Sequence, residues 1–213
     1  MKFENTEVWG FEHAIRGMRN PLESWKKSDS FIKSPHNYYV IGSNDFELMQ
    51  KLIKAGSEHR KFLRQIFVSV DITAPLYWWK ELDTYKVGTV SNSTSTMHKL
   101  ASTPITIDCF EMDDFEDCKD DSNVYVSAIW VESITRLEKL RQTYNATKDK
   151  RYWKELIRLL PESWLQKRTI TMNYENILNM YRQRKNHKLT EWSKSFCNWV
   201  KTLPYAEELL CLE

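Results

Sequence analysis

The stretch IFVSVDITAP, residues 66–75, constrains the fold more than any other part of the sequence. Branched apolar residues occupy every second position from Ile66 to Ile72, and the residues between them are mixed polar and aromatic. This two-residue period is typical of a strand with one buried face, and the proline at its end terminates the strand. The aromatic segment PLYWWKEL follows directly and predicts a short helix with Pro75 in its first turn.

Helical patterns are found on both sides of this strand. SNDFELMQKLIKAG, residues 43–56, has apolar residues at helical spacing, with Ser43 or Asn44 as its cap and Gly56 as its stop. Later helices are predicted at KRYWKELIRLLP, YENILNMYRQR and KLTEWSKSFCNWVKTL, and RTITMN predicts a short strand. We therefore expect an α/β or α+β fold with a central sheet flanked by helices.

Bulk composition limits the possible classes of protein. The 213 residues are 41% hydrophobic and 13% aromatic, so the chain can bury a sizeable core and is not disordered. The length predicts a single domain over residues 1–213. The net charge of +2 favours neither nucleic acid nor an anionic membrane as a partner. Four scattered cysteines without CxxC spacing, and no apolar run near ~18 residues, predict a cytoplasmic protein with no membrane span.

An acidic segment interrupts the pattern of helices and strands. DCFEMDDFEDCKDD, residues 108–121, carries eight carboxylates. Its spacing does not match an EF-hand, which needs a central glycine and a final glutamate at set positions. We therefore interpret residues around 105–125 as a solvated acidic loop inserted into the domain, and we expect no metal site.

Polar side chains recur beside apolar elements in three places. Residues 91–97 include five serines or threonines and one asparagine, which suits either a surface linker or a pocket for a phosphate or sugar. His59 precedes the central strand, and Asn173, Asn179 and Arg184 stand just before, within and at the end of the predicted helix YENILNMYRQR. An arginine at a helix end can bind phosphate through its planar fork. Each of these residues also has an ordinary interpretation as a cap, a solvated side chain or a core residue.

The order and register of these features resemble the flavin-dependent thymidylate synthases over roughly residues 43–200. In that family a helix leads to a histidine, then to a strand that ends in Ala-Pro, then to an Arg-His-Arg motif and a polar run with Asn and Ser. A Leu-Pro pair, a threonine-rich extended segment, two asparagines six residues apart and an arginine come later. This chain matches the pattern with His59, Ala74-Pro75, Asn92, Ser95, Leu160-Pro161, TITMN, Asn173, Asn179 and Arg184.

The resemblance implies an α/β fold, a homotetramer, and flavin sites built from several subunits. It implies FAD as cofactor, NADPH and methylenetetrahydrofolate as co-substrates, and a methyltransferase reaction that converts dUMP to dTMP or acts on a related pyrimidine nucleotide. By position, it implies cofactor contacts at His59, Thr84, Tyr85, Lys86, Asn92, Asn173 and Asn179, nucleotide contacts at Glu81, Ser95, Arg158 and Arg184, and catalytic roles for Ser95 and Arg184.

The chain departs from the family pattern where that pattern is most cationic. Thr84-Tyr85-Lys86 stands in place of Arg-His-Arg, and Met97 stands where an arginine is expected. Two alternatives to the enzyme therefore stay open. One is a catalytically inactive relative that binds or sequesters a nucleotide without flavin. The other is an interaction protein whose acidic segment docks on a basic partner.

Overall fold

The computed structural model describes residues 1–33 and 38–212, which form two compact units. The division falls within the two central strands, β4 (Phe67–Pro75) and β6 (Leu165–Asn173). The prediction of one domain with an acidic insert stays a prediction. The first unit comprises Met1–Lys2, Ile72–Thr84 and Asn92–Arg168, and the second comprises Phe3–Asp71, Tyr85–Ser91 and the chain from Thr169 onward.

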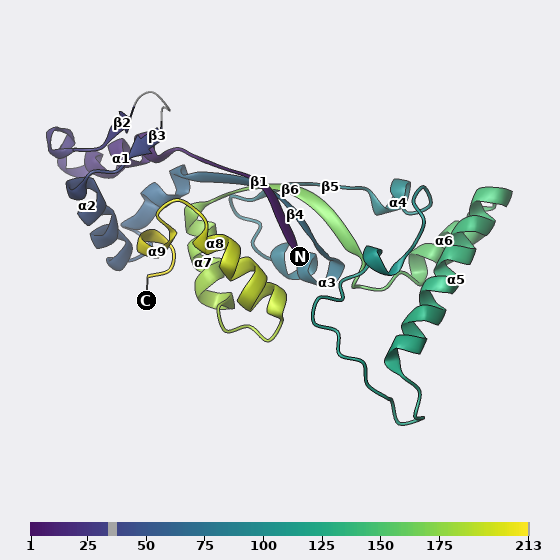
Figure 1. Cartoon of the computed structure of the whole chain (residues 1–213). Coiled ribbons are helices and arrows are strands. Elements are labelled where there is room, and N and C mark those ends of the chain that lie inside the picture. Colours follow the sequence, from purple (N-terminus) through teal and green to yellow (C-terminus); the bar gives the residue numbers. More distant parts are fainter. Residues whose placement is uncertain (34–37, 213) are drawn as a thin grey trace. The chain divides into compact units, whose positions relative to one another are not determined.

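A four-stranded sheet has the strand order β1-β4-β6-β5, where β1 is Lys2–Trp9 and β5 is Val90–Ser93 (Figure 1). Strand β4 alternates as the sequence predicts, because Val68, Val70, Ile72 and Ala74 are fully buried while the residues between them keep partial exposure. Sheet and helices together confirm the predicted mixed α/β fold.

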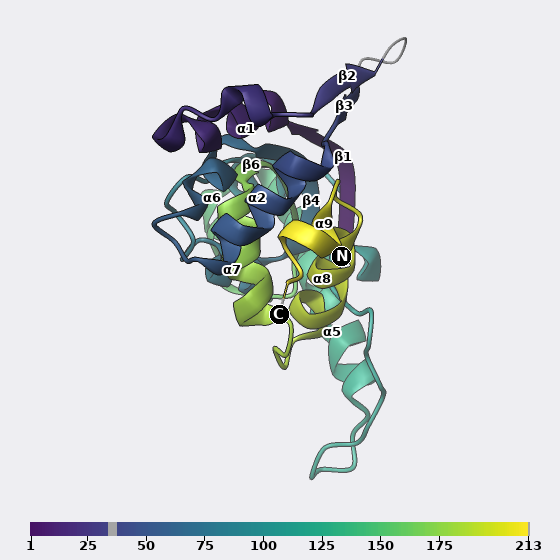
Figure 2. The ribbon, with the colours of Figure 1, turned by 90° about the vertical axis from the view of Figure 1, so that its left-hand side faces the viewer.

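The second unit contains most of the helices, and they enclose an aromatic core. Trp192 packs edge-on against Phe196, with ring centroids 5.1 Å apart, and both side chains are fully buried. Figure 2 shows α7 (Tyr174–Arg184) beside α8 (Cys197–Lys201), and α2 (Ser43–Lys54) beside α9 (Ala206–Leu209). Strands β2 and β3 pair antiparallel. The elements that lie wholly in the second unit are α1 (Phe11–Arg19), η1 (Asn20–Leu22), η2 (Trp25–Lys27), β2 (Phe31–Lys33), β3 (Tyr38–Val40), α2 (Ser43–Lys54), η3 (Arg60–Gln65), α7 (Tyr174–Arg184), η5 (Glu191–Phe196), α8 (Cys197–Lys201) and α9 (Ala206–Leu209).

The start of α2 corrects the predicted cap. Neither Ser43 nor Asn44 is the N-cap, since Gly42 takes that position. The carboxylate of Asp29 instead accepts the backbone N–H groups of Asn44 and Asp45, at 2.9 and 3.1 Å. A carboxylate at a helix start satisfies orphan donors and interacts favourably with the helix dipole. The cap comes from a residue 15 positions earlier, so no local pattern indicates it.

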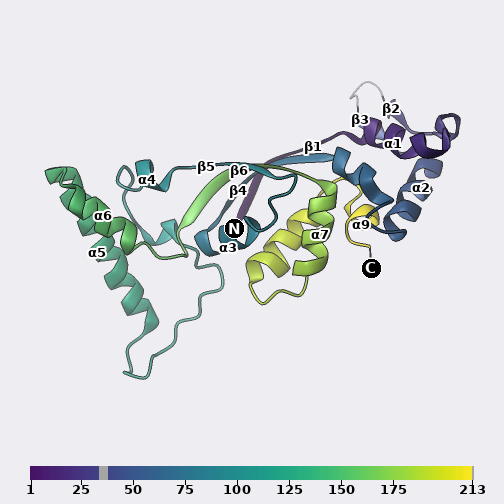
Figure 3. The same cartoon turned by 180° about the vertical axis from the view of Figure 1, so that it is seen from behind.

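The first unit packs around its own small cluster of buried side chains. In Figure 3 α5 (Val126–Thr147) and α6 (Lys150–Arg158) lie side by side, and Leu137 and Leu156 from these helices are buried. Ile129, near the start of α5, is 46% exposed. No helix in the described part of the chain is long and apolar enough to cross a membrane. The elements of this unit are α3 (Leu76–Leu82), α4 (Thr96–Lys99), η4 (Ile107–Cys109), α5 (Val126–Thr147) and α6 (Lys150–Arg158).

The acidic segment is partly ordered by its own carboxylates. Asp117 accepts hydrogen bonds from the backbone and hydroxyl of Ser127, at 3.0 and 2.7 Å, in the first turn of α5. Asp120 accepts the N–H groups of Ser122 and Val124 and so closes a tight turn. Among the residues with described positions, no group of three or more potential metal ligands comes together.

Glu138 on α5 holds the loop that follows α4. Its carboxylate accepts the backbone N–H of Ile105 at 2.8 Å and a two-pronged contact from Arg141 at 2.6 and 2.7 Å. The Arg141 hydrogen bonds are the main cause that lowers the pKa of Glu138 to about 2, against the opposing effect of burial. The charged form is therefore the one that stabilises the fold.

Glu138→Gln is expected to lower the free energy of unfolding by about 1–2 kcal/mol at neutral pH, a value reduced for partial solvent exposure. Because the folded pKa lies below the ordinary value of 4.5, the difference is full above pH 4.5 and shrinks as pH falls toward 2. Urea unfolding of both proteins across this range measures it. Glu132→Gln, on an exposed pair of the same helix, is the control and should cost little; equal losses would contradict the prediction.

Candidate functional site

Helix α7 begins with a reciprocal pair of asparagines. The Asn173 side chain accepts the backbone N–H of Asn176 at 3.0 Å, and the Asn176 side chain accepts the backbone N–H of Asn173 at 3.3 Å. This capping box satisfies two donors at the helix start and fixes both amides. Asn173 is only 8% exposed, so its side chain has a defined orientation.

The segment before β5 lies against this helix start. The Asn176 amide donates to the carbonyl of Val87 at 2.7 Å. Gly88 has a φ of +75°, and a Cβ built there would stand 2.8 Å from the Asn173 amide nitrogen. Only glycine accepts both the backbone angle and the close approach without strain. Residues 85–91 are thereby held beside the first turn of α7.

The other end of α7 places Arg184 between two aromatic rings. Its guanidinium carbon lies 5.0 Å from the Trp192 ring centroid and 5.6 Å from that of Tyr85. Its Nε donates to the Tyr85 hydroxyl at 3.0 Å, and that hydroxyl donates to Gln183 at 2.8 Å. Cation–π contacts and the hydrogen bond fix the orientation of a half-buried cation. Tyr85 therefore holds Arg184 in place.

Asn179, in the middle of α7, is tied to η3. Arg60 donates to the Asn179 carbonyl oxygen at 3.0 Å and to Glu175 at 3.2 Å. Arg64 also pairs with Glu175, and this hydrogen bond raises the pKa of Arg64. One carboxylate thus pairs with two arginines.

His59 directly precedes Arg60 but lines a cavity of about 1020 Å³ with residues from α1, η1 and η2. The second unit therefore brings together Asn179 with Arg60, Tyr85 with Arg184, and Asn173 with the 85–91 segment. Lys86, next to Tyr85, is exposed.

The remaining sequence candidates belong to the first unit. Ser95 caps α4 by accepting the backbone N–H of His98 at 3.2 Å, and it lines a cavity of about 350 Å³. Arg158 is exposed and pairs with Glu155 on its own helix. The others are Glu81, which is half-buried at the end of α3, Thr84, whose hydroxyl donates to the Glu81 carbonyl at 2.7 Å, and Asn92, which is exposed on β5.

No family model matches the sequence, and no curated protein matches it. The structure does have matches. A crystal structure of the flavin-dependent thymidylate synthase ThyX from Helicobacter pylori, complexed with FAD and dUMP, superposes with a TM-score of 0.70 over 100% of both chains, at 18% identity. A second ThyX structure from the same organism, with FAD and dUMP, gives 0.71 over 99% of this chain and 97% of the other, at 16% identity.

The chain has the fold of a flavin-dependent thymidylate synthase. At these identities the likeness concerns the fold, and it confirms the resemblance inferred from the sequence at that level. The match covers the whole chain, including residues 1–42, which the sequence resemblance did not reach.

Within this thymidylate synthase fold, several partners of the candidate residues had escaped sequence reasoning. The sequence alone suggests that Arg60 and Glu175 are ordinary surface charges and that Trp192 is a core residue of a helix. Gly88 carried the one usable signal, because a lone glycine in a chain with five glycines often marks a strained or crowded position.

Proposed function

We propose that the chain is a divergent flavin-dependent thymidylate synthase-like enzyme that binds a pyrimidine nucleotide and methylates it reductively, as in the conversion of dUMP to dTMP. The observation that carries the proposal is the fixed guanidinium of Arg184, held by Tyr85 at the end of α7 in a fold whose structural neighbours are complexed with FAD and dUMP. By the same resemblance the working form is a cytoplasmic homotetramer.

Arg184 is suited to an anionic nucleotide. A guanidinium that is half-buried and already oriented loses little side-chain entropy when it binds phosphate or a ring carbonyl. The Tyr85 hydroxyl and the Trp192 ring orient the guanidinium, and neither of these two groups carries a charge. Arg184 would therefore bind the nucleotide and Tyr85 would position Arg184.

The donors beside α7 also fit FAD. Lys86 makes no ion pair with any residue that the structure describes, and it supplies a cation for a diphosphate. The side-chain oxygen of Asn179 already accepts a hydrogen bond from Arg60. The side-chain N–H₂ group of Asn179 is therefore the group that can donate to a ring carbonyl. Lys86, Asn179 and His59 would hold the flavin, with Asn173 fixed beside them. When bound, FAD supplies the redox chemistry, with NADPH and methylenetetrahydrofolate as co-substrates.

The visible absorption spectrum of freshly purified protein tests the flavin assignment. We expect flavin bands, or their appearance after FAD is added, together with growth of a thymidine auxotroph that expresses the chain. Colourless protein that fails to bind FAD at high micromolar concentration would remove the flavin enzyme from consideration.

The alternative is a nucleotide-binding relative that works without flavin. It is favoured by Thr84-Tyr85-Lys86, which offers one cation where the family motif offers two arginines and a histidine. In that case pyrimidine nucleotides, added without flavin, should raise the melting temperature of the protein in a thermal-shift assay. A flat response to every nucleotide would exclude this alternative.

A further inference from the structure

The end of β1, the first turn of α1, the β2–β3 hairpin and the residues before α9 line a cavity of about 670 Å³. This volume is within the range of small-molecule sites, and the residues that line it all belong to the second unit. The aromatic residues of the lining are Trp9, Phe11, Tyr39 and Tyr205. Trp9 stacks on Phe67, with ring centroids 5.9 Å apart, and is nevertheless 43% exposed. We call this space the aromatic cavity.

Tyr205 adopts a backbone conformation that tyrosine rarely takes. Its φ is +56°, in the left-handed region. The ring packs edge-on against Phe11, with centroids 5.6 Å apart, and the hydroxyl accepts the backbone N–H of Ile41 at 3.3 Å. These contacts hold the residue in its strained conformation. Strain of this kind is concentrated at ligand sites, so it points to a role for the Tyr205 ring in binding.

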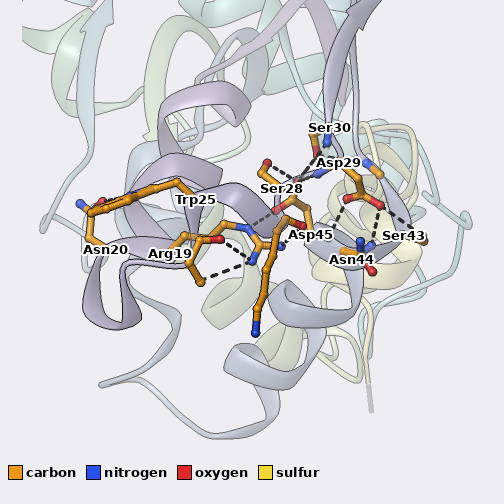
Figure 4. A network of polar contacts seen from close by, with 12 residues as sticks. Arg19, Asn20, Trp25, Ser28, Asp29, Ser30, Ser43, Asn44 and Asp45 are labelled. Carbon is orange, nitrogen blue, oxygen red and sulfur yellow. Dashed lines mark hydrogen bonds and ion pairs between the residues drawn. The ribbon is translucent and has the colours of Figure 1, made fainter.

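The hairpin supplies a wall that is fixed before any ligand binds. Ile32 and Tyr39 are directly opposite each other in the β2–β3 register, so their side chains lie on the same face of the hairpin. At its base, the buried carboxylate of Asp45 accepts the backbone N–H and the hydroxyl of Ser30, at 3.1 and 2.7 Å (Figure 4). The Ser30 oxygen in turn accepts the backbone N–H of Gly42 at 3.0 Å. Both ends of the hairpin are thereby tied to one carboxylate.

The lining of the aromatic cavity carries a negative charge. Among its described residues, Glu12 is the only carboxylate, and there is no lysine or arginine. Glu12 is exposed and forms no ion pair with any residue of described position. Burial raises the pKa of Tyr39, and the charges of Asp45 and Glu12 raise it further, so Glu12 acts electrostatically on this side of the cavity. His13 donates its Nε2 proton to the carbonyl of Gln65 at 3.0 Å.

Rings and a carboxylate, without a competing cation, favour an organic cation as ligand. The face of an aromatic ring is the negative end of its quadrupole, and alkylated ammonium groups bind among such rings. An anion would meet Glu12 and no cationic side chain of the described lining. We propose that the aromatic cavity binds a small quaternary ammonium compound, whose ammonium group lies among Trp9, Tyr39 and Tyr205 with Glu12 as its counter-charge. This site is independent of the proposed function.

A ligand-observed NMR titration of the intact protein with choline tests the proposal, and it needs neither flavin nor nucleotide. The control ligand is 3,3-dimethyl-1-butanol, which has the shape of choline but a carbon atom in place of the charged nitrogen. We expect choline to bind, and the uncharged compound to bind at least about tenfold more weakly, because only the cation is attracted by the ring quadrupoles. Equal affinities, or no binding of choline up to about 10 mM, would overturn the proposal.

Substitutions in the lining identify the groups that bind. Trp9→Leu and Tyr39→Leu should each weaken choline binding about fivefold, whereas Tyr39→Phe keeps the ring and should change it by less than about twofold. Glu12→Gln should weaken it about threefold. Glu47→Gln removes an exposed carboxylate on α2, outside the lining, and should leave affinity unchanged. Thermal unfolding establishes that each variant is folded. Full affinity in both leucine variants would show that choline binds elsewhere and would reject the site.

Two further ligands distinguish the possible sources of a trimethylammonium group. Phosphocholine, the headgroup of a common lipid, adds a phosphate for which the described lining offers no cation, so it should bind more weakly than choline. A short peptide with one trimethyllysine presents the same group on a protein chain, and it too should bind more weakly. Tighter binding of either ligand than of choline would overturn the assignment to a small free compound.

Discussion

Replacing Asp45 by asparagine is expected to lower the free energy of unfolding by about 3–5 kcal/mol, because it leaves the buried guanidinium of Arg19 without the carboxylate that pairs with it. The Asp45 carboxylate also accepts the hydroxyls of Ser28 and Ser30, at 2.6 and 2.7 Å, and the backbone N–H groups of Asp29 and Ser30, each at 3.1 Å. An amide offers two donors to a site where every neighbour is itself a donor. Chemical denaturation at neutral pH measures the loss.

A double-mutant cycle separates the ion pair from general damage to the core. Arg19→Met alone should also destabilise, but Asp45→Asn combined with Arg19→Met should cost less than the sum of the two. Burial opposes ionisation of Asp45, yet its hydrogen bonds outweigh burial and lower its pKa. Its contribution is therefore present above the ordinary value of 3.8 and is lost as pH falls through the folded value. Strict additivity of the two substitutions would contradict this account.

The largest expected effect on function is at Arg184. Arg184→Gln should weaken dUMP binding about 100-fold, the size expected when a charge-assisted contact to an anion is removed. Tyr85→Phe keeps the ring but removes the hydroxyl that orients the guanidinium, and should weaken binding about threefold to tenfold. Calorimetry with dUMP measures both.

Arg182→Gln provides the matched comparison, because Arg182 lies two residues earlier on α7 and is exposed. It changes net charge by the same amount, so a purely long-range electrostatic effect would make the two arginine variants alike. We expect Arg182→Gln to change affinity by less than about threefold. Equal losses in both variants would show that Arg184 has no specific contact with the nucleotide.

The regular elements were predictable because their signals are local. The alternation from Ile66 to Ile72 defined β4, and Asn173 preceding an apolar helical pattern marked the start of α7. A strand with one buried face needs an apolar residue at every second position, and a helix needs one at every third or fourth position, so both periods are visible in the sequence.

The polar interior was not predictable from the same signals. Asp45 reads as an acidic residue in the first turn of a helix, where aspartate is ordinarily exposed, yet its partner Arg19 lies 26 residues away. Tyr85 and Arg184 are 99 residues apart. Contacts of this kind depend on how elements pack, and a single sequence records neither the pairing nor its geometry.

The carboxylates of the acidic segment have a practical consequence for the alternative in which this segment docks on a basic partner. Asp117 and Asp120 hold the first turn of α5 and the turn before it. Deleting the loop would destabilise the start of α5 as well as remove negative charge from the surface. If a partner no longer bound the truncated protein, the experiment could not tell these two causes apart. Replacing Glu116 by Gln and Asp121 by Asn, two exposed carboxylates of the same segment, leaves both anchoring aspartates in place and so separates the loss of electrostatic attraction from the loss of helix structure.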